Sequence, residues 1–208
     1  MVIQREPEEL QNKVRSLDSS PINFNLRQTS RKASMANIFL ISDTHFSHEN
    51  ILTFYKSDGS KLRDFDSVQE MDETMVQNWN RVVKPLDRIY HLGDVAISHK
   101  ALPIFSRLNG RKVLIKGNHD QAKLSQYLPY FDDIRAYHQL DKMLLTHVPV
   151  HSESLSRWTH NIHGHTHSNV VGGSTPDLRY IPVCVEQPWM NYTPISLEEL
   201  KVVIEKRT

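Results

Sequence analysis

At 208 residues, 38% hydrophobic and 24% charged, the chain has the composition of one ordinary globular domain with a single core. Its formal net charge of +1 gives no electrostatic indication that it binds nucleic acid or an anionic membrane. Nothing in the sequence indicates an oligomeric state. Its one cysteine, Cys184, cannot form an internal disulfide, and no apolar run has the length of a signal-peptide core or a membrane span, so we expect a cytoplasmic protein.

Residues 1–36 differ in composition from the rest of the chain. They are rich in Gln, Asn, Ser, Arg and Glu, and their apolar residues show little periodicity. This composition predicts a loosely ordered N-terminal extension, followed by a domain that spans residues 37–208. The first predicted element of that domain is a buried strand from Ile38 to Ile41.

A long helix is predicted from Ser67 to about Val83. Ser67 and Glu70 form a capping-box pattern, apolar residues recur at helical spacing, and Pro85 ends the helix. The elements predicted next are a strand at 88–92, a helix at about 100–108 and a strand at 112–116. Alternation of strands and helices favours a parallel α/β sheet in this half of the domain.

The second half of the chain predicts short strands without long helices between them. The candidate strands are residues 134–140, 143–147, 159–162 and 180–186. Because polar loops rather than long helices separate these strands, we expect a second sheet. The last predicted element is a helix from about Leu197 to Lys206, with Ser196 and Glu199 as its capping box.

Side chains that can bind metal ions follow several of these apolar or strand-like runs. They are Asp43 with His45, Asp94, Asn118 with His119, His147, and His165 with His167. Functional groups of α/β proteins collect at the carboxyl ends of strands, and oxygen and nitrogen donors that converge there predict a metal site. For Asp43 and His45 taken alone, a strand-terminating turn with a solvated histidine is the alternative interpretation.

In their order along the chain, these segments resemble the five signature blocks of the calcineurin-like metallophosphoesterase family. The blocks are Asp43-Thr-His45, Gly93-Asp94, Gly117-Asn-His-Asp120, His147 and Gly164-His-Thr-His167. Within that family the sequence resembles the small, capless bacterial and phage members. The resemblance implies an α/β fold, a four-layer αββα sandwich of two mixed β-sheets flanked by helices, with a two-metal site at the strand ends.

The resemblance also implies a role for each residue of the site. One metal ion would be held by Asp43, His45, Asp94 and His167. The other would be held by Asp94, Asn118, His147 and His165, with Asp94 as the bridge. The expected cofactor is two divalent metal ions, with Mn as the first expectation and Fe, Zn or Ni as alternatives.

The chemistry of such a site predicts phosphoester hydrolysis. Two ions acidify a shared water molecule, and the resulting hydroxide attacks the phosphorus of an anionic ester. His119 would protonate the leaving alkoxide, and Asp120 would orient His119 through its other ring nitrogen. The expected substrate is a phosphomonoester or phosphodiester, a nucleotide or another small phosphate ester. A catalytically silent scaffold of the same fold and a metal-dependent nuclease are the alternatives.

Four further residues near these segments have two interpretations each. His48 either reaches the substrate phosphate or lies in a surface loop, and His151 either lines the pocket or does not. His163 either points into the site or makes a structural hydrogen bond, which is the preferred interpretation. Arg63 either clamps a substrate phosphate or is a solvated loop residue.

Overall fold

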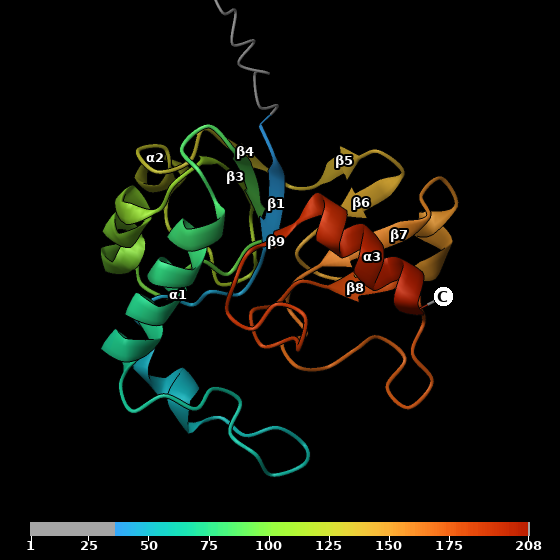
Figure 1. Ribbon diagram of the computed structural model, residues 1–208, viewed down its shortest axis with the longest axis horizontal. Helices are drawn as coiled ribbons and strands as arrows, with labels where there is room; N and C mark the ends of the chain where they lie inside the picture. Colours follow the sequence, from blue (N-terminus) through green and yellow to red (C-terminus); the bar gives the residue numbers. More distant parts are fainter. Residues whose placement is uncertain (1–35, 208) are drawn as a thin grey trace, which may run out of the picture. The chain divides into compact units, whose positions relative to one another are not determined.

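The computed structural model of the protein describes residues 36–207. The predicted N-terminal extension lies outside the described residues, except for its last residue. Two mixed β-sheets flanked by helices make up the described part, so the predicted α/β architecture is confirmed (Figure 1). Within residues 36–207, no helix combines the length and the apolar character needed to cross a membrane.

The first sheet has five strands in the order β4-β3-β2-β1-β9. Their bounds are β1 Ile38–Ile41, β2 Arg88–His91, β3 Arg111–Ile115, β4 Asp133–Arg135 and β9 Ile195–Ser196. Strands β1 to β4 run parallel, and the short β9 pairs antiparallel with β1. The carboxyl ends of β1, β2 and β3 therefore lie at the same edge of the sheet.

The second sheet has four strands in the order β5-β6-β7-β8. Their bounds are β5 His138–Leu140, β6 Met143–Leu145, β7 His160–His163 and β8 Tyr180–Pro182. Strands β6, β7 and β8 are parallel, and β5 is antiparallel to β6. The strand predicted at 134–140 is divided in two, because its first half pairs with β3 and its second half pairs with β6.

The predicted strand at 180–186 also changes partner partway along. After β8 ends at Pro182, the chain leaves the second sheet and reaches the end of β1. There the Ser42 amide donates to the Val183 carbonyl oxygen at 2.9 Å, and the Val185 amide donates to the Ser42 carbonyl oxygen at 3.2 Å. The two sheets are thus hydrogen-bonded to each other where β1 ends.

The serines predicted to cap two helices accept the expected backbone hydrogen bonds. Helix α1, Val68–Val82, begins after Ser67, whose hydroxyl accepts from the Glu70 amide at 3.1 Å. The Glu70 carboxylate accepts from the amide of Asp66 rather than from that of Ser67, so α1 has half of the expected box. Helix α3, Leu197–Arg207, has both halves, between Ser196 and Glu199.

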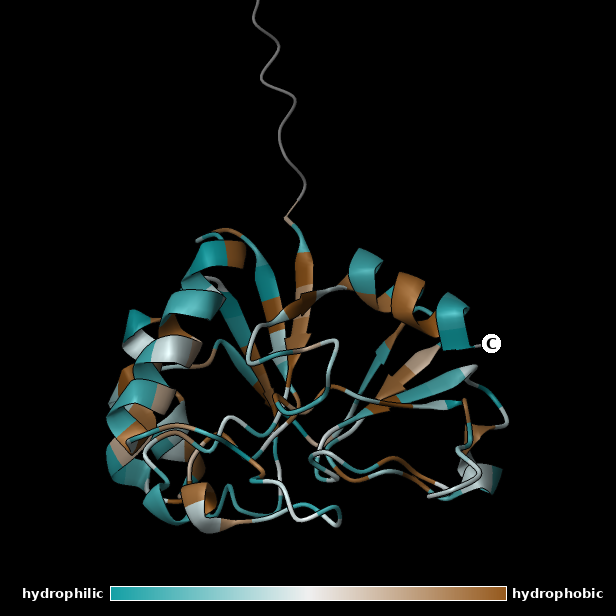
Figure 2. Cartoon of the chain, turned by 60° about the horizontal axis from the view of Figure 1, so that its bottom comes forward, coloured by the Kyte–Doolittle hydropathy of each residue, from teal (hydrophilic) through white to brown (hydrophobic). Residues whose placement is uncertain are grey.

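The helix predicted at 100–108 is instead a 3-10 helix, η2 at His99–Arg107. Pro103 lies inside it, and a proline there removes a backbone donor and disfavours regular α-helix. Three other short helices complete the described part of the chain: η1 Glu49–Thr53, α2 Leu124–Tyr127 and η3 Ser152–Leu155. Helices α1 and α2 lie on one side of the sheets and α3 on the other (Figure 1). Hydrophobic and hydrophilic residues both occur along the helices (Figure 2).

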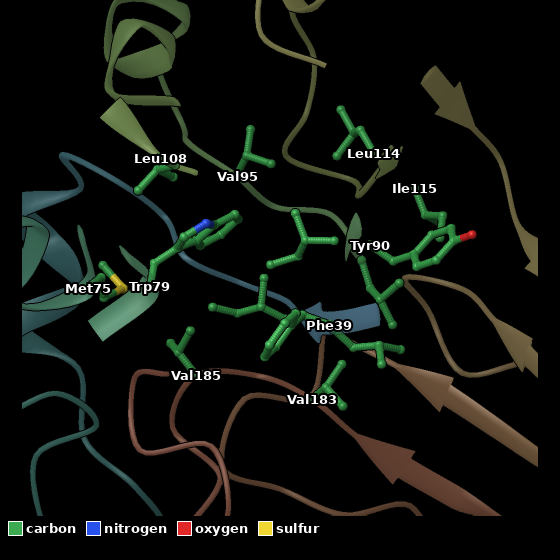
Figure 3. Close-up of a cluster of buried hydrophobic side chains, with 14 of the residues drawn as sticks. Phe39, Met75, Trp79, Tyr90, Val95, Leu108, Leu114, Ile115, Val183 and Val185 are labelled. Atoms are coloured by element: carbon green, nitrogen blue, oxygen red, sulfur yellow. The ribbon is translucent and has the colours of Figure 1, made fainter. Parts of the chain in front are cut away.

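The core is built around the buried side of α1. Met75 and Trp79 from α1 gather near Phe39 of β1, together with Val183 and Val185 from the segment after β8 (Figure 3). The Trp79 side chain is fully buried, and its Nε1–H donates to the Asn109 carbonyl oxygen at 2.9 Å. One continuous core therefore reaches from α1 through the first sheet to the segment that joins the sheets.

Replacing Trp79 by alanine should lower the free energy of unfolding by about 3–5 kcal/mol, because it leaves a large cavity and an unpaired carbonyl group. Urea denaturation measures this change. The matched control is Val202→Ala on α3, where the side chain is 47% exposed and the change should stay within about 0.5 kcal/mol. A loss below about 1 kcal/mol for Trp79→Ala would contradict this account of the core.

Candidate metal centre

Strand ends from both sheets meet at one place, and the residues predicted to bind metal lie there. Asp43 and His45 follow β1, Asp94 follows β2, Asn118 follows β3, His147 follows β6, and His165 and His167 follow β7. The fold brings these side chains into two adjoining groups. Each group takes side chains from both sheets.

The first cluster consists of Asp43, His45 and His167. One donor atom from each of them lies within 4.8 Å of the others. The Oδ1 atom of Asp43 is 3.8 Å from Nε2 of His45 and 4.0 Å from Nε2 of His167. The two imidazole rings stack with their centroids 5.3 Å apart. Two imidazole nitrogens and one carboxylate oxygen thus face a common point.

The second cluster consists of Asp94, His147 and His165, with Asn118 beside them. The Oδ1 atom of Asn118 is 2.9 Å from Nε2 of His147 and 2.9 Å from Nδ1 of His165. His147 is oriented by its other ring nitrogen, Nδ1, which lies 2.7 Å from the carbonyl oxygen of Leu92. Its Nε2 atom is thereby directed toward the other donors of the cluster.

Asp94 lies between the two clusters. Its Oδ2 atom is 3.6 Å from Nε2 of His45 in the first cluster and 3.3 Å from Nε2 of His147 in the second. The carboxylate is almost fully buried, at 1% exposure of the residue. A single side chain therefore faces both groups of donors.

The chemistry of these atoms fits metal ions. Both ring nitrogens of His45 are buried, and within the described structure neither has a hydrogen-bond partner. Burial, with the nearby Arg63 guanidinium, lowers the pKa of His45 to about 2, so the imidazole is neutral. A buried polar atom without a partner costs roughly 1–3 kcal/mol, a cost that a bound cation would remove. Carboxylate, amide and imidazole donors together suit divalent Mn, Fe, Ni or Zn.

The two carboxylates of the centre differ in their ionisation. Burial raises the pKa of Asp43, although His167 and His147 oppose that shift. Burial also opposes ionisation of Asp94, but hydrogen bonding and charge interaction with His147 and the backbone amide of His119 lower its pKa to about 2. Asp94 is therefore the more strongly ionised of the two.

The backbone of the centre is unusual at most of the donor residues. Positive φ angles occur at Asp43 (58°), His45 (46°), Asp94 (55°), His165 (69°) and His167 (51°). Residues with a Cβ rarely adopt this left-handed region, and each such residue costs on the order of 1–3 kcal/mol. Close approach adds a second constraint, since a Cβ at Gly164 would lie 2.6 Å from Oδ2 of Asp43. Convergence of the donors thus depends on strained backbone and on a glycine.

A buried ion pair supports the first cluster. The Glu186 side chain is 1% exposed, and its Oε1 atom lies 2.6 Å from Nη2 of Arg63 and 2.9 Å from Nδ1 of His167. Although burial opposes ionisation, Arg63 and His167 lower the pKa of Glu186 to about 2. Because Nδ1 of His167 faces Glu186, its Nε2 atom faces Asp43. Arg63 also donates to the carbonyl oxygens of Asp43 and Thr44.

Sequence reasoning missed this support. Arg63 was expected either to clamp a phosphate or to be solvated, but its side chain is fully buried and bonded to Glu186. Glu186 was not among the predicted site residues. It ends the run 180–186, just as the donors end other strand-like runs, and that position was the available signal.

His119 lies at the edge of the centre. The residue is exposed, and its imidazole ring is 5.6 Å from that of His45 between centroids. Its backbone amide donates to Oδ1 of Asp94 at 2.8 Å. His119 is therefore held next to the clusters by its backbone, with its side chain open to solvent.

Asp120 contacts the backbone rather than the His119 ring. Its Oδ2 atom accepts from the amides of Asp94, at 2.9 Å, and Gly117, at 2.8 Å, and its Oδ1 atom accepts from the amide of Val95 at 3.0 Å. Among the described residues, no hydrogen bond joins Asp120 to the His119 imidazole. The expected orienting contact is replaced because backbone donors occupy both carboxylate oxygens, and Asp120 instead ties together the loops after β2 and β3.

The additional histidines lie in different surroundings. His48 is half-buried, with its ring centroid 5.9 Å from that of His45. His163 is fully buried, and its Nδ1 atom lies 2.8 Å from the Gly164 carbonyl oxygen, as the structural interpretation predicts. His151 is exposed and precedes η3. The ring of His48 thus lies near the predicted ligand His45.

Comparison with known proteins finds several that are similar to this chain. No protein-family profile matches it. Gene 66 protein of Mycobacterium phage L5 is 26% identical, over 66% of this chain and 80% of that protein. The crystal structure of the protein of unknown function AQ665 from Aquifex aeolicus has a TM-score of 0.63 and 31% sequence identity, covering 81% of this chain and 99% of that one.

An archaeal relative matches over most of its length. The uncharacterized protein MJ1445 of Methanocaldococcus jannaschii is 37% identical over 184 residues, which are 83% of this chain and 94% of that protein. An identity of this size over so much of both chains indicates common descent and a shared fold. The chain therefore belongs to the protein family that includes MJ1445.

Proposed function

We propose that this protein is a two-metal phosphoesterase of the calcineurin-like type, which hydrolyses a phosphomonoester or phosphodiester. The observation that carries the proposal is the position of Asp94, whose Oδ2 atom lies 3.6 Å from Nε2 of His45 and 3.3 Å from Nε2 of His147. A carboxylate between two donor clusters suits the bridge that two nearby cations need. The two mixed sheets and the ordered signature segments support the same conclusion.

Each cluster would hold one divalent ion. The proposed ligands are Asp43, His45, Asp94 and His167 for the first, and Asp94, Asn118, His147 and His165 for the second. Mn is the expected metal, with Fe, Zn or Ni as alternatives. When bound, such a pair of ions supplies an acidified water molecule near neutral pH and positive charge that attracts a phosphate ester.

The charge of the surrounding residues favours an anionic substrate. Asp43 and Asp94 would offset only about half of the charge of two divalent ions. Glu186 adds little further negative charge, because its carboxylate is paired with Arg63. A nucleotide or another small phosphate ester would therefore be attracted to the centre.

His119 is the proposed proton donor. Its exposed ring lies beside His45, where it can reach the oxygen that leaves phosphorus. Asp120 positions it indirectly, because it fixes the backbone on both sides of the centre. All the proposed ligands and the proposed acid are present and close together, which favours an active hydrolase over a silent scaffold.

Replacing Asp94 by asparagine should reduce turnover of bis-p-nitrophenyl phosphate by several orders of magnitude and release metal from both clusters, because the charged bridge is lost. Turnover with Mn²⁺ and metal content by mass spectrometry are measured together. The matched control is Asp64→Asn, at a side chain that is 85% exposed, and it should change neither quantity. Near-normal metal content in Asp94→Asn would refute the bridging assignment.

The change His119→Ala should leave metal content intact and slow esters according to their leaving groups. Hydrolysis of phenyl phosphate, whose leaving group needs a proton, should fall by about 10²–10⁴-fold, and that of p-nitrophenyl phosphate much less. The control His151→Ala removes a histidine side chain that is 74% exposed and should have no effect. Equal slowing of both esters would mean that His119 is not the acid.

The change Glu186→Gln should weaken metal binding by about 10–100-fold, because His167 loses its charged hydrogen-bond acceptor. Competition with a metal chelator measures the affinity, and circular dichroism checks that the variant is folded. Glu153→Gln, at a side chain that is 91% exposed, is the control. Unchanged affinity in a folded Glu186→Gln variant would separate Glu186 from the metal centre.

A further inference from the structure

A hollow opens directly beside the second cluster. Its volume is about 600 Å³, and its wall includes Asn118 and His147, both of which belong to the proposed ligands. A hollow of this size is within the range that small-molecule sites occupy. A group attached to a phosphate at the candidate metal centre could therefore extend into this hollow.

The wall of the hollow is mainly apolar and aromatic. Its larger apolar and aromatic side chains are those of Tyr137, Trp158, Leu144, Val148 and Val150. Tyr137 is 61% exposed and Val148 is 49% exposed, so both leave apolar surface for a ligand to cover. Aromatic walls of this kind suit flat rings, which stack on them face to face or edge to face.

Part of this wall packs against buried residues of the second sheet and of η3. Trp158 and Val150 pack against the buried cluster of Leu144, Leu155 and Tyr180. The Val150 carbonyl oxygen accepts from the Tyr180 hydroxyl at 2.7 Å. The Trp158 and Val150 side of the hollow is therefore formed before any ligand arrives, and little ordering of these two residues opposes binding.

The charged side chains around the hollow are less favourable to a cationic ligand than to a neutral or anionic one. Among the residues that the structure describes, no carboxylate lines the hollow, and its basic side chains are those of Lys116 and the proposed ligand His147. An uncharged aromatic group on a phosphate ester suits this lining, because the ring contacts apolar walls while the phosphate stays at the clusters.

The placement of His119 indicates which end of the substrate lies here. The His119 ring is next to His45 of the first cluster, and His119 is not part of the wall of the hollow. The leaving group must lie near the proton donor, so the hollow faces the group that stays on phosphorus. This assignment rests on the proposed function.

We infer that the substrate is a phosphodiester whose retained group carries a flat aromatic ring, as a nucleoside does, and that this ring binds between Tyr137 and Trp158. Base stacking on an aromatic side chain is strong and tolerant of ring type. The hollow would therefore select diesters with an aromatic retained group over those with a small alkyl group.

Three diesters that share the p-nitrophenolate leaving group test the inference: methyl, phenyl and thymidine 5′-p-nitrophenyl phosphate. Each hydrolysis joins the oxygen of one water molecule to phosphorus and releases p-nitrophenolate, with the water protons passing to solvent. Tyr137→Ala should lower kcat/KM about tenfold for the phenyl and thymidine esters and leave the methyl ester within about twofold. Trp158→Phe, which keeps a ring, should have a smaller effect in the same direction.

A second hollow supplies the matched control. Its volume is about 530 Å³, and it is lined by Phe54 and Tyr55 next to His165 and His167. Tyr55 is 66% exposed, close to the value for Tyr137, so Tyr55→Ala removes a comparable ring on another side of the centre. Tyr55→Ala should leave all the thymidine, phenyl and methyl ester rates nearly unchanged.

Three outcomes would overturn the inference. An equal fall for every ester in Tyr137→Ala would mean that the hollow receives the leaving group. A selective fall in Tyr55→Ala instead would assign the retained group to the second hollow. Unchanged rates in both Tyr137→Ala and Trp158→Phe would show that the first hollow binds no part of the substrate.

A binding measurement separates this inference from the proposed function. Calorimetric titration with thymidine 5′-monophosphate is carried out on wild type and Tyr137→Ala, with and without Mn²⁺. Weaker binding in Tyr137→Ala supports the aromatic site even if the protein hydrolyses neither phosphomonoesters nor phosphodiesters, a result that would refute the proposed hydrolysis but not the site. Equal binding to both proteins refutes the aromatic site, whatever the turnover.

Discussion

The buried ion pair between Arg63 and Glu186 connects several parts of the candidate metal centre. Burying two charges is costly, and hydrogen bonds with other groups offset part of that cost. Arg63 donates to the carbonyl oxygens of Asp43 and Thr44, and Glu186 faces Nδ1 of His167. Removing one partner of such a pair typically costs about 3–5 kcal/mol, since the other is left charged and unpaired. The pair thus joins the end of β1 to the segments that follow β7 and β8.

Hydrogen bonds with buried side chains hold the strained backbone of the candidate metal centre in place. His45 and four other donor residues hold left-handed backbone conformations that side chains with a Cβ rarely adopt. Such conformations persist when the surroundings hold them in place from several sides. Asp120 does so by accepting three backbone hydrogen bonds near Asp94, and Arg63 does so at the carbonyl oxygens after β1. The donors converge because neighbouring charged groups oppose relaxation of the backbone.

Local pattern in the sequence predicted the larger elements and the set of candidate ligands. Helix α1 and the strands that precede the donors follow from periodicity and capping, which depend on nearby residues. The partners of a segment depend on residues far along the chain, and this is where prediction failed. Residues 134–140 are shared between two sheets, and 180–186 leaves one sheet for the other. Arg63 forms a hydrogen bond with Glu186, which lies 123 positions further along the chain, and no local sequence pattern predicts such a contact.

The division of donors between the sheets links metal binding to the integrity of the fold. Asp43 and Asp94 follow strands of the first sheet, whereas His147 and His167 follow strands of the second. An ion held by either cluster would therefore act as a cross-link between the two sheets, at the place where a few hydrogen bonds from Ser42 already join them. Binding to the folded state alone raises its stability by mass action. The concentration of free metal in the cell would then help to set how long each molecule survives unfolding and proteolysis.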